Sequence, residues 1–155
     1  MQALRVPSAL DSSLLICDLR RRRKDSALAE LVTRAAEAGA VRWPDALTDL
    51  IAVREAAVTS ALGRGAALVA ARSLAVNHAC LVLGRSPGGI GWGAPDGEPV
   101  RLVAVLLAPA DRPLAAHLNA VTRVGGLLRH SRMRERLRKA DSADELAARV
   151  REALS

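Results

Sequence analysis

Apolar residues follow two different spacings along this chain, and each spacing predicts a different element. Short, nearly continuous apolar runs at 14–19, 66–71, 79–84 and 100–109 are typical of strands buried inside a sheet. Elsewhere, apolar residues recur every three or four positions, which predicts helices that bury one face. The chain is therefore expected to combine buried strands with amphipathic helices.

Two helices are predicted between the first and second strands. Asp25 or Ser26 can cap the first helix, and Gly39 ends it. Pro44 suits the first turn of the second helix. The first helix is expected to bury Leu28, Leu31, Val32 and Ala35, and the second Leu47, Leu50 and Ile51.

Three further helices are predicted after the last strand. Ser131 can cap a basic helix that runs to Lys139, and Ser142 and Glu145 have the spacing of a capping box for the final helix. The final helix is expected to bury Leu146, Val150 and Leu154. The first of the three carries His117 at the edge of an apolar stripe formed by Leu114, Leu118, Val121 and Val124.

The connections carry turn signals. The glycine-rich segment 86–93 is expected to be a loop or hairpin, and the Ala-Pro-Asp-Gly sequence at 94–97 predicts a turn. In segment 63–72, Gly63 and Gly65 allow positive φ before a small apolar strand that ends at Arg72. A turn, a strand and a terminal cation can form an anion site, although the spacing alone favours an ordinary buried strand.

Segment 63–72 resembles the signature of the type-2 EIIA domains of the bacterial phosphotransferase system, the fructose, mannitol and nitrogen-regulatory branch. Three positions depart from the signature. Arg64 stands in place of Asn, Val69 in place of Pro, and Ala70 in place of the histidine that carries the phosphoryl group. The matching positions are Gly63, Gly65, Ala67, Leu68, Ala71 and Arg72.

The resemblance continues over the whole chain. Its most specific part is the order of a Gly-Arg strand end, an Ala-Pro-Asp-Gly turn and a strand closing in Leu-Leu-Ala-Pro. The matching segments are 84–85, 94–97, 106–109, 117–118, 134–137 and 142–146. The resemblance implies one domain over residues 1–155, with an α/β fold built as a three-layer α/β/α sandwich around a mixed central sheet.

The resemblance also implies a chemistry and shows what is missing from it. Members of the family take a phosphoryl group from HPr onto a histidine and pass it to EIIB, which requires an imidazole nitrogen as nucleophile. The methyl group of Ala70 cannot do this. Arg54, Gly63, Gly65 and Arg72 are expected to form the remnant of the anion site, and His117 takes the place of the family's second histidine.

The leading hypothesis is a regulatory or protein-binding pseudo-phosphocarrier whose partners are HPr, an EIIB-like protein or a regulatory protein. Because Arg64 and Val69 also depart from the signature, natural divergence explains Ala70 better than an engineered change. One alternative is an active phosphocarrier with a displaced acceptor, either His117 or His78.

A second alternative is a basic nucleic-acid-binding module, supported by the net charge of +7 and by the basic segments 20–24 and 129–139. We rank it last, because aromatic residues make up 1% of the chain and no groove-reading helix is evident.

Composition limits the remaining possibilities. The 155 residues, 50% of them hydrophobic, suffice for one domain with a core. No apolar run reaches membrane-spanning length, no signal peptide is evident, and Cys17 and Cys80 are expected to be reduced thiols, so we expect a cytoplasmic protein. No metal-ligand spacing or cofactor motif is recognised, and the oligomeric state is left open.

Overall fold

A mixed five-stranded sheet forms the middle layer of the protein, whose computed structural model describes residues 14–154. The strand order is β1-β4-β5-β3-β2. β1 runs parallel to β4 and β3 parallel to β5, whereas β4 is antiparallel to β5 and β2 to β3. The strands are β1 (Leu14–Asp18), β2 (Ala61–Gly63), β3 (Ala66–Ser73), β4 (Cys80–Ile90) and β5 (Val100–Pro109).

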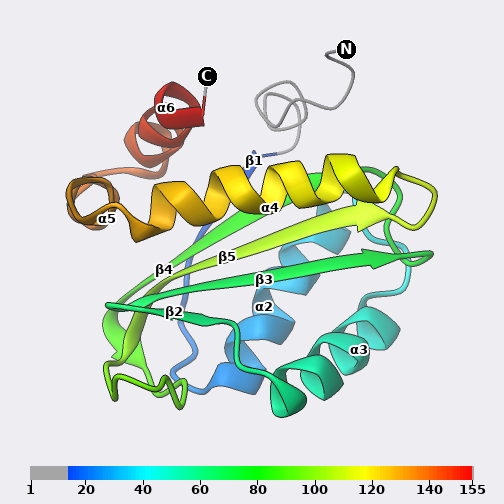
Figure 1. The fold of residues 1–155 in the computed structure, drawn as a ribbon, viewed down its shortest axis with the longest axis horizontal. Helices are drawn as coiled ribbons and strands as arrows, with labels where there is room; N and C mark the ends of the chain where they lie inside the picture. The colour runs from blue at the N-terminus through cyan, green and yellow to red at the C-terminus, as the bar shows by residue number, and fades with distance from the viewer. Residues whose placement is uncertain (1–13, 155) are drawn as a thin grey trace.

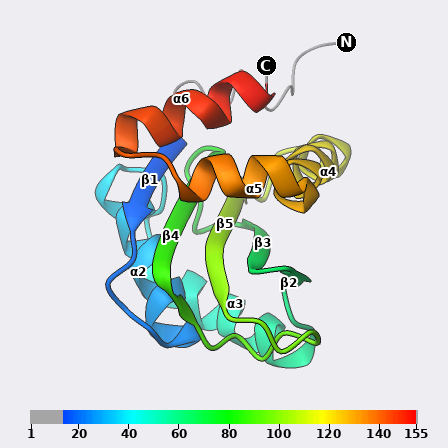
Figure 2. The same ribbon diagram turned by 90° about the vertical axis from the view of Figure 1, so that its left-hand side faces the viewer.

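Helices cover both faces of this sheet, as Figures 1 and 2 show. Helices α2 (Lys24–Glu37) and α3 (Pro44–Ala57) lie on one face. Helices α4 (Leu114–Arg129), α5 (Ser131–Arg138) and α6 (Ala143–Leu154) lie on the other. The predicted three-layer α/β/α sandwich with a mixed central sheet is thereby confirmed.

β5 lies at the centre of the sheet and is covered on both faces, as its continuous apolar run predicts. Successive side chains of a strand point to opposite faces. Val103, Val105 and Leu107 accordingly belong to the core under α2 and α3. Leu102, Ala104 and Leu106 belong to the core under α4 to α6. The fold thus has two apolar cores separated by the sheet.

The expected loop at 86–93 is wrong in its first half, because β4 continues through it to Ile90. The pairing of β4 with β5 shifts register between Arg85 and Ile90, and Ile90 then pairs with Val100. The glycines in this stretch therefore accommodate an irregularity inside a strand. The turn at 94–97 is present, with the Gly97 N–H donating to the Ala94 carbonyl at 2.9 Å.

Two of the predicted helix caps are also wrong. Helix α2 begins at Lys24 with Arg23 as its N-cap, where no side chain caps the helix. Arg23 forms a bridge with Gly91, so tertiary pairing decides where the helix begins. In α5 the N-cap is His130, whose Nδ1 accepts a hydrogen bond from the Met133 N–H at 3.4 Å.

The expected apolar face of α4 is rotated in the structure. Leu114 and Leu118 are each 52% exposed, whereas His117 is only 6% exposed and faces the sheet. The buried face includes Ala116 and Ala120, whose small side chains allow the helix to pack closely on the strands. In α3, Leu50 is likewise exposed, contrary to expectation.

Other expectations hold. Leu146, Val150 and Leu154 are buried by α6. Ser142 Oγ accepts from the Glu145 N–H at 3.1 Å, although the Glu145 carboxylate accepts from the Asp141 N–H and not from that of Ser142. Both cysteines are free thiols. None of the helices described within residues 14–154 has the length and apolar character needed to cross a membrane.

Candidate functional site

The second half of β3 forms an open edge of the sheet. β2 pairs only with Ala66 and Ala67 at the start of β3, and the Leu68 N–H donates to the Ser60 carbonyl at 3.0 Å. Beyond this point, within the described residues, β3 has a strand neighbour only in β5, where Ala70 pairs with Leu106. Ala70 therefore lies on an edge strand between α3 and α4 (Figure 1).

A small hollow of about 190 Å³ opens at this edge. Ala70, Leu68 and Val69 of β3 form one side of it, and Arg54 and other residues of α3 form the opposite side. The structure therefore places Arg54 and Ala70 at one hollow, although they lie 16 positions apart in the sequence.

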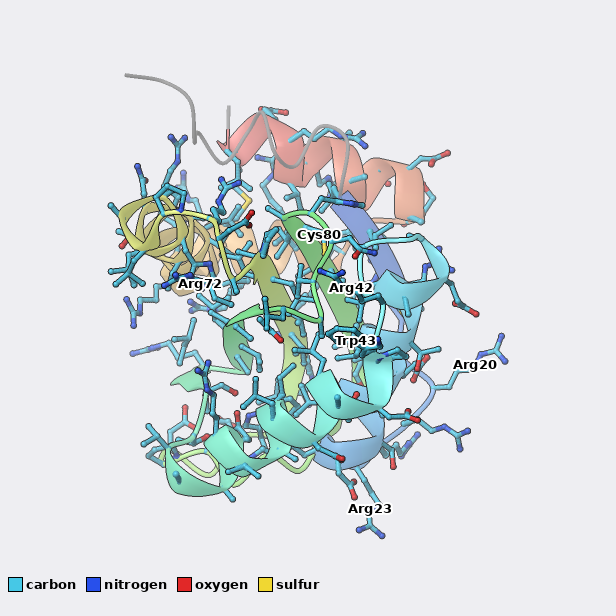
Figure 3. The ribbon with its side chains drawn as sticks, turned by 90° about the vertical axis from the view of Figure 1, so that its right-hand side faces the viewer. Arg20, Arg23, Arg42, Trp43, Arg72 and Cys80 are labelled. Carbon is cyan, nitrogen blue, oxygen red and sulfur yellow. The ribbon has the colours of Figure 1, made fainter. Side chains whose placement is uncertain are left out.

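Arg72 follows Ala70 on the same side of β3. Its Nη2 donates to the Ala110 carbonyl at 3.1 Å. Its Nε is buried without a hydrogen-bond partner, and is the one such side-chain nitrogen or oxygen among residues 14–154. A buried donor without an acceptor costs about 1–3 kcal/mol. Figure 3 shows Arg72 below α4, so this unused donor lies at the edge described above.

His117 reaches the same region from α4. Burial lowers the pKa of its imidazole below the usual 6.5, and the nearby positive charges of Arg72, Arg112 and Arg54 lower it further. The ring is therefore held in its neutral form at neutral pH. Ala70, Arg54, Arg72 and His117 thus form one cluster, which we call the Ala70 edge.

Glu55 anchors the helix that supplies Arg54. Its carboxylate pairs with Lys24 Nζ at 2.8 Å and accepts from the Ser60 N–H at 2.9 Å. Burial by itself raises the pKa of Glu55, but the bonds from Lys24 and Ser60 outweigh it and leave the pKa below its usual range. The ion pair between Lys24 and Glu55 was not predicted from the sequence. The one sequence signal at Glu55 was its place directly after Arg54.

The structure does not bring Gly63 and Gly65 to the Ala70 edge. They form the β2–β3 turn, with φ of +87° and +83°. The Arg64 N–H between them donates to Asp96 Oδ2 at 2.8 Å, and the Gly65 carbonyl accepts from the Arg101 N–H at 2.8 Å. At about 3.3 Å per residue, this turn lies about 20 Å along the strand from Ala70.

The other histidines lie elsewhere. His78 is exposed in the connection between β3 and β4, and His130 is exposed between α4 and α5. Over residues 14–154, no group of His, Cys, Asp and Glu side chains is arranged to hold a metal ion.

Exposed apolar side chains occur on α3 and α4 and directly after β3, the elements that frame the Ala70 edge, and sequence reasoning missed them. Leu74 follows β3 and is 68% exposed. Exposed apolar side chains that form a contiguous patch are typical of a surface that contacts another protein. The set, which we call the apolar frame, consists of Leu50 and Val53 on α3, Val58 directly after it, Leu74, and Leu114 and Leu118 on α4.

Comparison with known proteins identifies the family. The model of the phosphoenolpyruvate-dependent sugar phosphotransferase system EIIA 2 family matches residues 8–153. This chain belongs to the EIIA 2 family. The family resemblance read from the sequence is therefore confirmed.

Curated relatives include members of the fructose and nitrogen-regulatory branches. The chain is 32% identical over 119 residues to a fructose-specific EIIA component of Haloferax volcanii, covering 77% of each protein. It is 32% identical over 123 residues to a nitrogen regulatory protein of Bradyrhizobium diazoefficiens, covering 79% of each. It matches 143 residues of the fructose-specific EIIABC component of Bacillus subtilis at 26% identity, and spans only 22% of that longer EIIA relative.

Solved structures of EIIA proteins share the fold. The nitrogen regulatory protein IIA-Ntr of Neisseria meningitidis superposes with a TM-score of 0.79 at 25% identity, covering 97% of this chain and 99% of that one. A mannitol EIIA of Escherichia coli, solved in complex with phosphorylated EIIB, superposes with a TM-score of 0.70 at 19% identity, covering 90% of this chain and 94% of that one.

Proposed function

We propose that this chain is an EIIA protein that binds a protein partner at the Ala70 edge and carries no phosphoryl group at residue 70. The observation that carries the proposal is the methyl group of Ala70 among Arg54, Arg72 and His117. The charged surroundings suit a phosphoryl group, whereas the atom that would form the bond to phosphorus is missing.

The loss of the carrier follows from the chemistry. Transfer through an EIIA protein needs a nucleophilic nitrogen with a lone pair, and a second ring nitrogen that is held in place. Arginines can stabilise the transferring charge, but they stay protonated and do not replace the nucleophile.

Binding remains possible because the Ala70 edge retains its charges and its apolar frame. Arg54 is exposed and Arg72 is partly exposed, and their positive charges can attract an acidic or phosphorylated group of a partner. The apolar frame around the Ala70 edge can be covered by the same partner. We therefore infer a protein partner of the HPr or EIIB type, or a regulatory protein with an acidic group at its centre.

The first test is the intact mass of the protein after incubation with phosphoenolpyruvate, enzyme I and HPr. We expect no added phosphoryl group on the wild-type chain. The Ala70→His variant, and Val69→Pro/Ala70→His with the family's proline restored, are expected to accept one acid-labile phosphoryl group if the surrounding site is intact. Stoichiometric, acid-labile labelling of the wild type contradicts the proposal.

The second test measures binding of HPr and EIIB, each phosphorylated and unphosphorylated, by surface plasmon resonance. Leu118→Asp places a charge in the apolar frame and is expected to abolish binding. Arg151→Asp, an exposed change on α6, is the matched control and is expected to bind normally. If Leu118→Asp and Arg151→Asp weaken the binding of HPr or EIIB equally, that result argues against a partner at the Ala70 edge.

A second candidate function, transfer through His117, is favoured by one observation. The lowered pKa of His117 keeps it neutral, and three arginines surround it, as suits a phosphoryl acceptor. Its exposure of only 6% opposes access by a donor protein. If the wild type is labelled and His117→Gln is not, His117 is the acceptor.

A further inference from the structure

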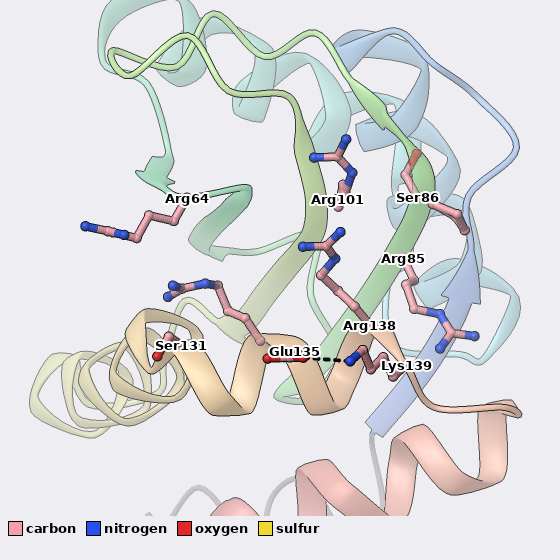
Figure 4. A pocket seen from close by; sticks show the side chains of 10 residues that line it. Arg64, Arg85, Ser86, Arg101, Ser131, Glu135, Arg138 and Lys139 are labelled. Carbon is pink, nitrogen blue, oxygen red and sulfur yellow. Dashed lines mark hydrogen bonds and ion pairs between the residues drawn. The ribbon is translucent and has the colours of Figure 1, made fainter.

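A second hollow, of about 520 Å³, lies on the sheet face covered by α5. Six of the ten residues that line it are Arg or Lys, and one, Glu135, is acidic. In Figure 4, Arg101 of β5 and Arg138 of α5 extend toward the same space, whereas the side chain of Arg64, on the β2–β3 turn at the rim, extends away from them. We call this hollow the arginine pocket.

The buried cations of the arginine pocket already have partners. Arg85 Nε pairs with Asp18 at 3.0 Å, and its Nη1 donates to the Leu137 and Ala140 carbonyls. Arg134 Nη1 donates to the Leu128 carbonyl at 3.0 Å. These bonds fix the floor of the pocket and the position of α5 above the sheet.

Among the described residues, the remaining arginines of the pocket form no ion pair, although the carboxylates of Asp96 and Glu135 lie near enough to interact electrostatically with Arg64 and Arg138. Within residues 14–154, no carboxylate lies at ion-pair distance from Arg64, Arg101 or Arg138. Glu135 pairs with Lys139 at 2.6 Å, and Asp96 accepts from the backbone N–H groups of Arg64 and Glu98. The guanidinium groups of Arg101 and Arg138, which extend toward the same space, repel each other unless an anion lies between them.

Arg64 has an unfavourable backbone conformation for a residue with a side chain. Its φ is +54°, and it is the one residue other than glycine with a positive φ among residues 14–154. Asn, the family's residue at this position, tolerates this conformation better than Arg does. The substitution therefore adds a cation to the pocket at a cost in backbone strain.

The lining indicates the class of ligand. Guanidinium groups bind phosphate oxygens through paired N–H donors. A hollow of this size accommodates a small metabolite. No aromatic side chain lines it, so it offers no stacking surface for a nucleobase. We propose that the arginine pocket binds a small anion with at least two phosphate groups, such as a sugar bisphosphate or a short inorganic polyphosphate.

This site is separate from the Ala70 edge. Arg64 lies six residues before Ala70, or about 20 Å along the strand. A ligand in the pocket therefore does not touch the Ala70 edge, and the inference stands independently of the proposed function.

The experiment is isothermal titration of the full chain with inorganic tripolyphosphate at low salt. We expect saturable binding of one equivalent, weakened about tenfold or more by Arg101→Gln and by Arg138→Gln. Arg20→Gln is the control, because Arg20 extends away from the ribbon in Figure 3 and lies outside the pocket. It is expected to bind like the wild type.

Arg64→Asn gives a test that a folding defect cannot imitate. It is expected to weaken tripolyphosphate binding while raising the melting temperature by about 2–4 °C, since it removes a cation from the rim of the pocket and relieves backbone strain. No binding by the wild type, or equal weakening by Arg20→Gln, overturns the proposal. Binding of a single-stranded oligonucleotide that depends on Arg101 and Arg138, and that tripolyphosphate does not displace, also overturns it in favour of nucleic acid.

Discussion

Replacing Lys24 with Met is expected to destabilise the fold more than the loss of an exposed ion pair would. Lys24 Nζ lies 2.8 Å from the Glu55 carboxylate, and the exposed fractions of the two side chains are 25% and 7%. At that distance the attraction is about 6 kcal/mol for an effective dielectric constant of about 20. Much of it offsets the cost of removing both charges from water.

The net effect depends on what is left behind. Removing one partner of a fully buried pair costs about 3–5 kcal/mol. Here Glu55 keeps its bond from the Ser60 N–H, and Lys24 is partly exposed, so we expect a loss of about 2–3 kcal/mol. For a chain of this length, that lowers the melting temperature by about 5–10 °C. The lost contact of Lys24 with the Trp92 ring adds to the effect.

The loss of stability in Lys24→Met is expected to depend on pH in a definite direction. The native pKa of Glu55 is lowered from 4.5, so the wild-type pair contributes stability above that pH and loses it in acid. Without Lys24, one of the groups that lower the pKa of Glu55 is lost and burial is opposed only by Ser60, so the charged form is less well stabilised. The free energy of unfolding of Lys24→Met is therefore expected to fall furthest below that of the wild type near neutral pH, and the difference is expected to shrink as the solution is acidified.

The assay is urea unfolding of wild type, Lys24→Met, Glu55→Gln and the double variant, at about pH 4 and about pH 7. The double variant is expected to be more stable than the sum of the single losses predicts. Lys139→Met removes an exposed pair of similar length, 2.6 Å to Glu135, and is expected to change stability very little. Additive losses, or a deficit of equal size at both pH values, refute the reasoning.

Three further predictions concern buried groups. Because the native pKa of His117 lies below 6.5, stability is expected to rise with pH up to about 6.5, and His117→Gln should flatten that rise in urea titrations at several pH values. A Cβ on Gly84 would lie 2.9 Å from methyl carbons of Leu19 and Leu31, so Gly84→Ala is expected to cost about 1–3 kcal/mol by the same assay. Burial raises the pKa of Cys17 to about 11 and of Cys80 to about 12, so both thiols should react slowly with Ellman's reagent in the native protein and rapidly in denaturant.

The sequence by itself determined four of the five strands, although not β2 or the second half of β4, and the family resemblance implied the layers. The apolar run of β5 predicts a strand covered on both faces, and the structure confirms it. The final helix was equally readable from its capping residue and its stripe. These features can be predicted because the spacing of apolar side chains along a helix or strand shows which of its faces is buried. The resemblance read from the sequence likewise predicts that Ala70 stands at the position of the family histidine.

The tertiary structure decided which side chains meet. Helix α4 has apolar residues on more than one face, and its packing on the sheet buried His117 and left Leu114 and Leu118 in solvent. The pairing of Lys24 with Glu55 and the grouping of Arg64, Arg101 and Arg138 join residues that are distant in sequence. Local spacing determines the period of an element, but its rotation and its neighbours depend on the surface against which it packs. For that reason the Ala70 edge could be named from the sequence, whereas its apolar frame and the arginine pocket could not.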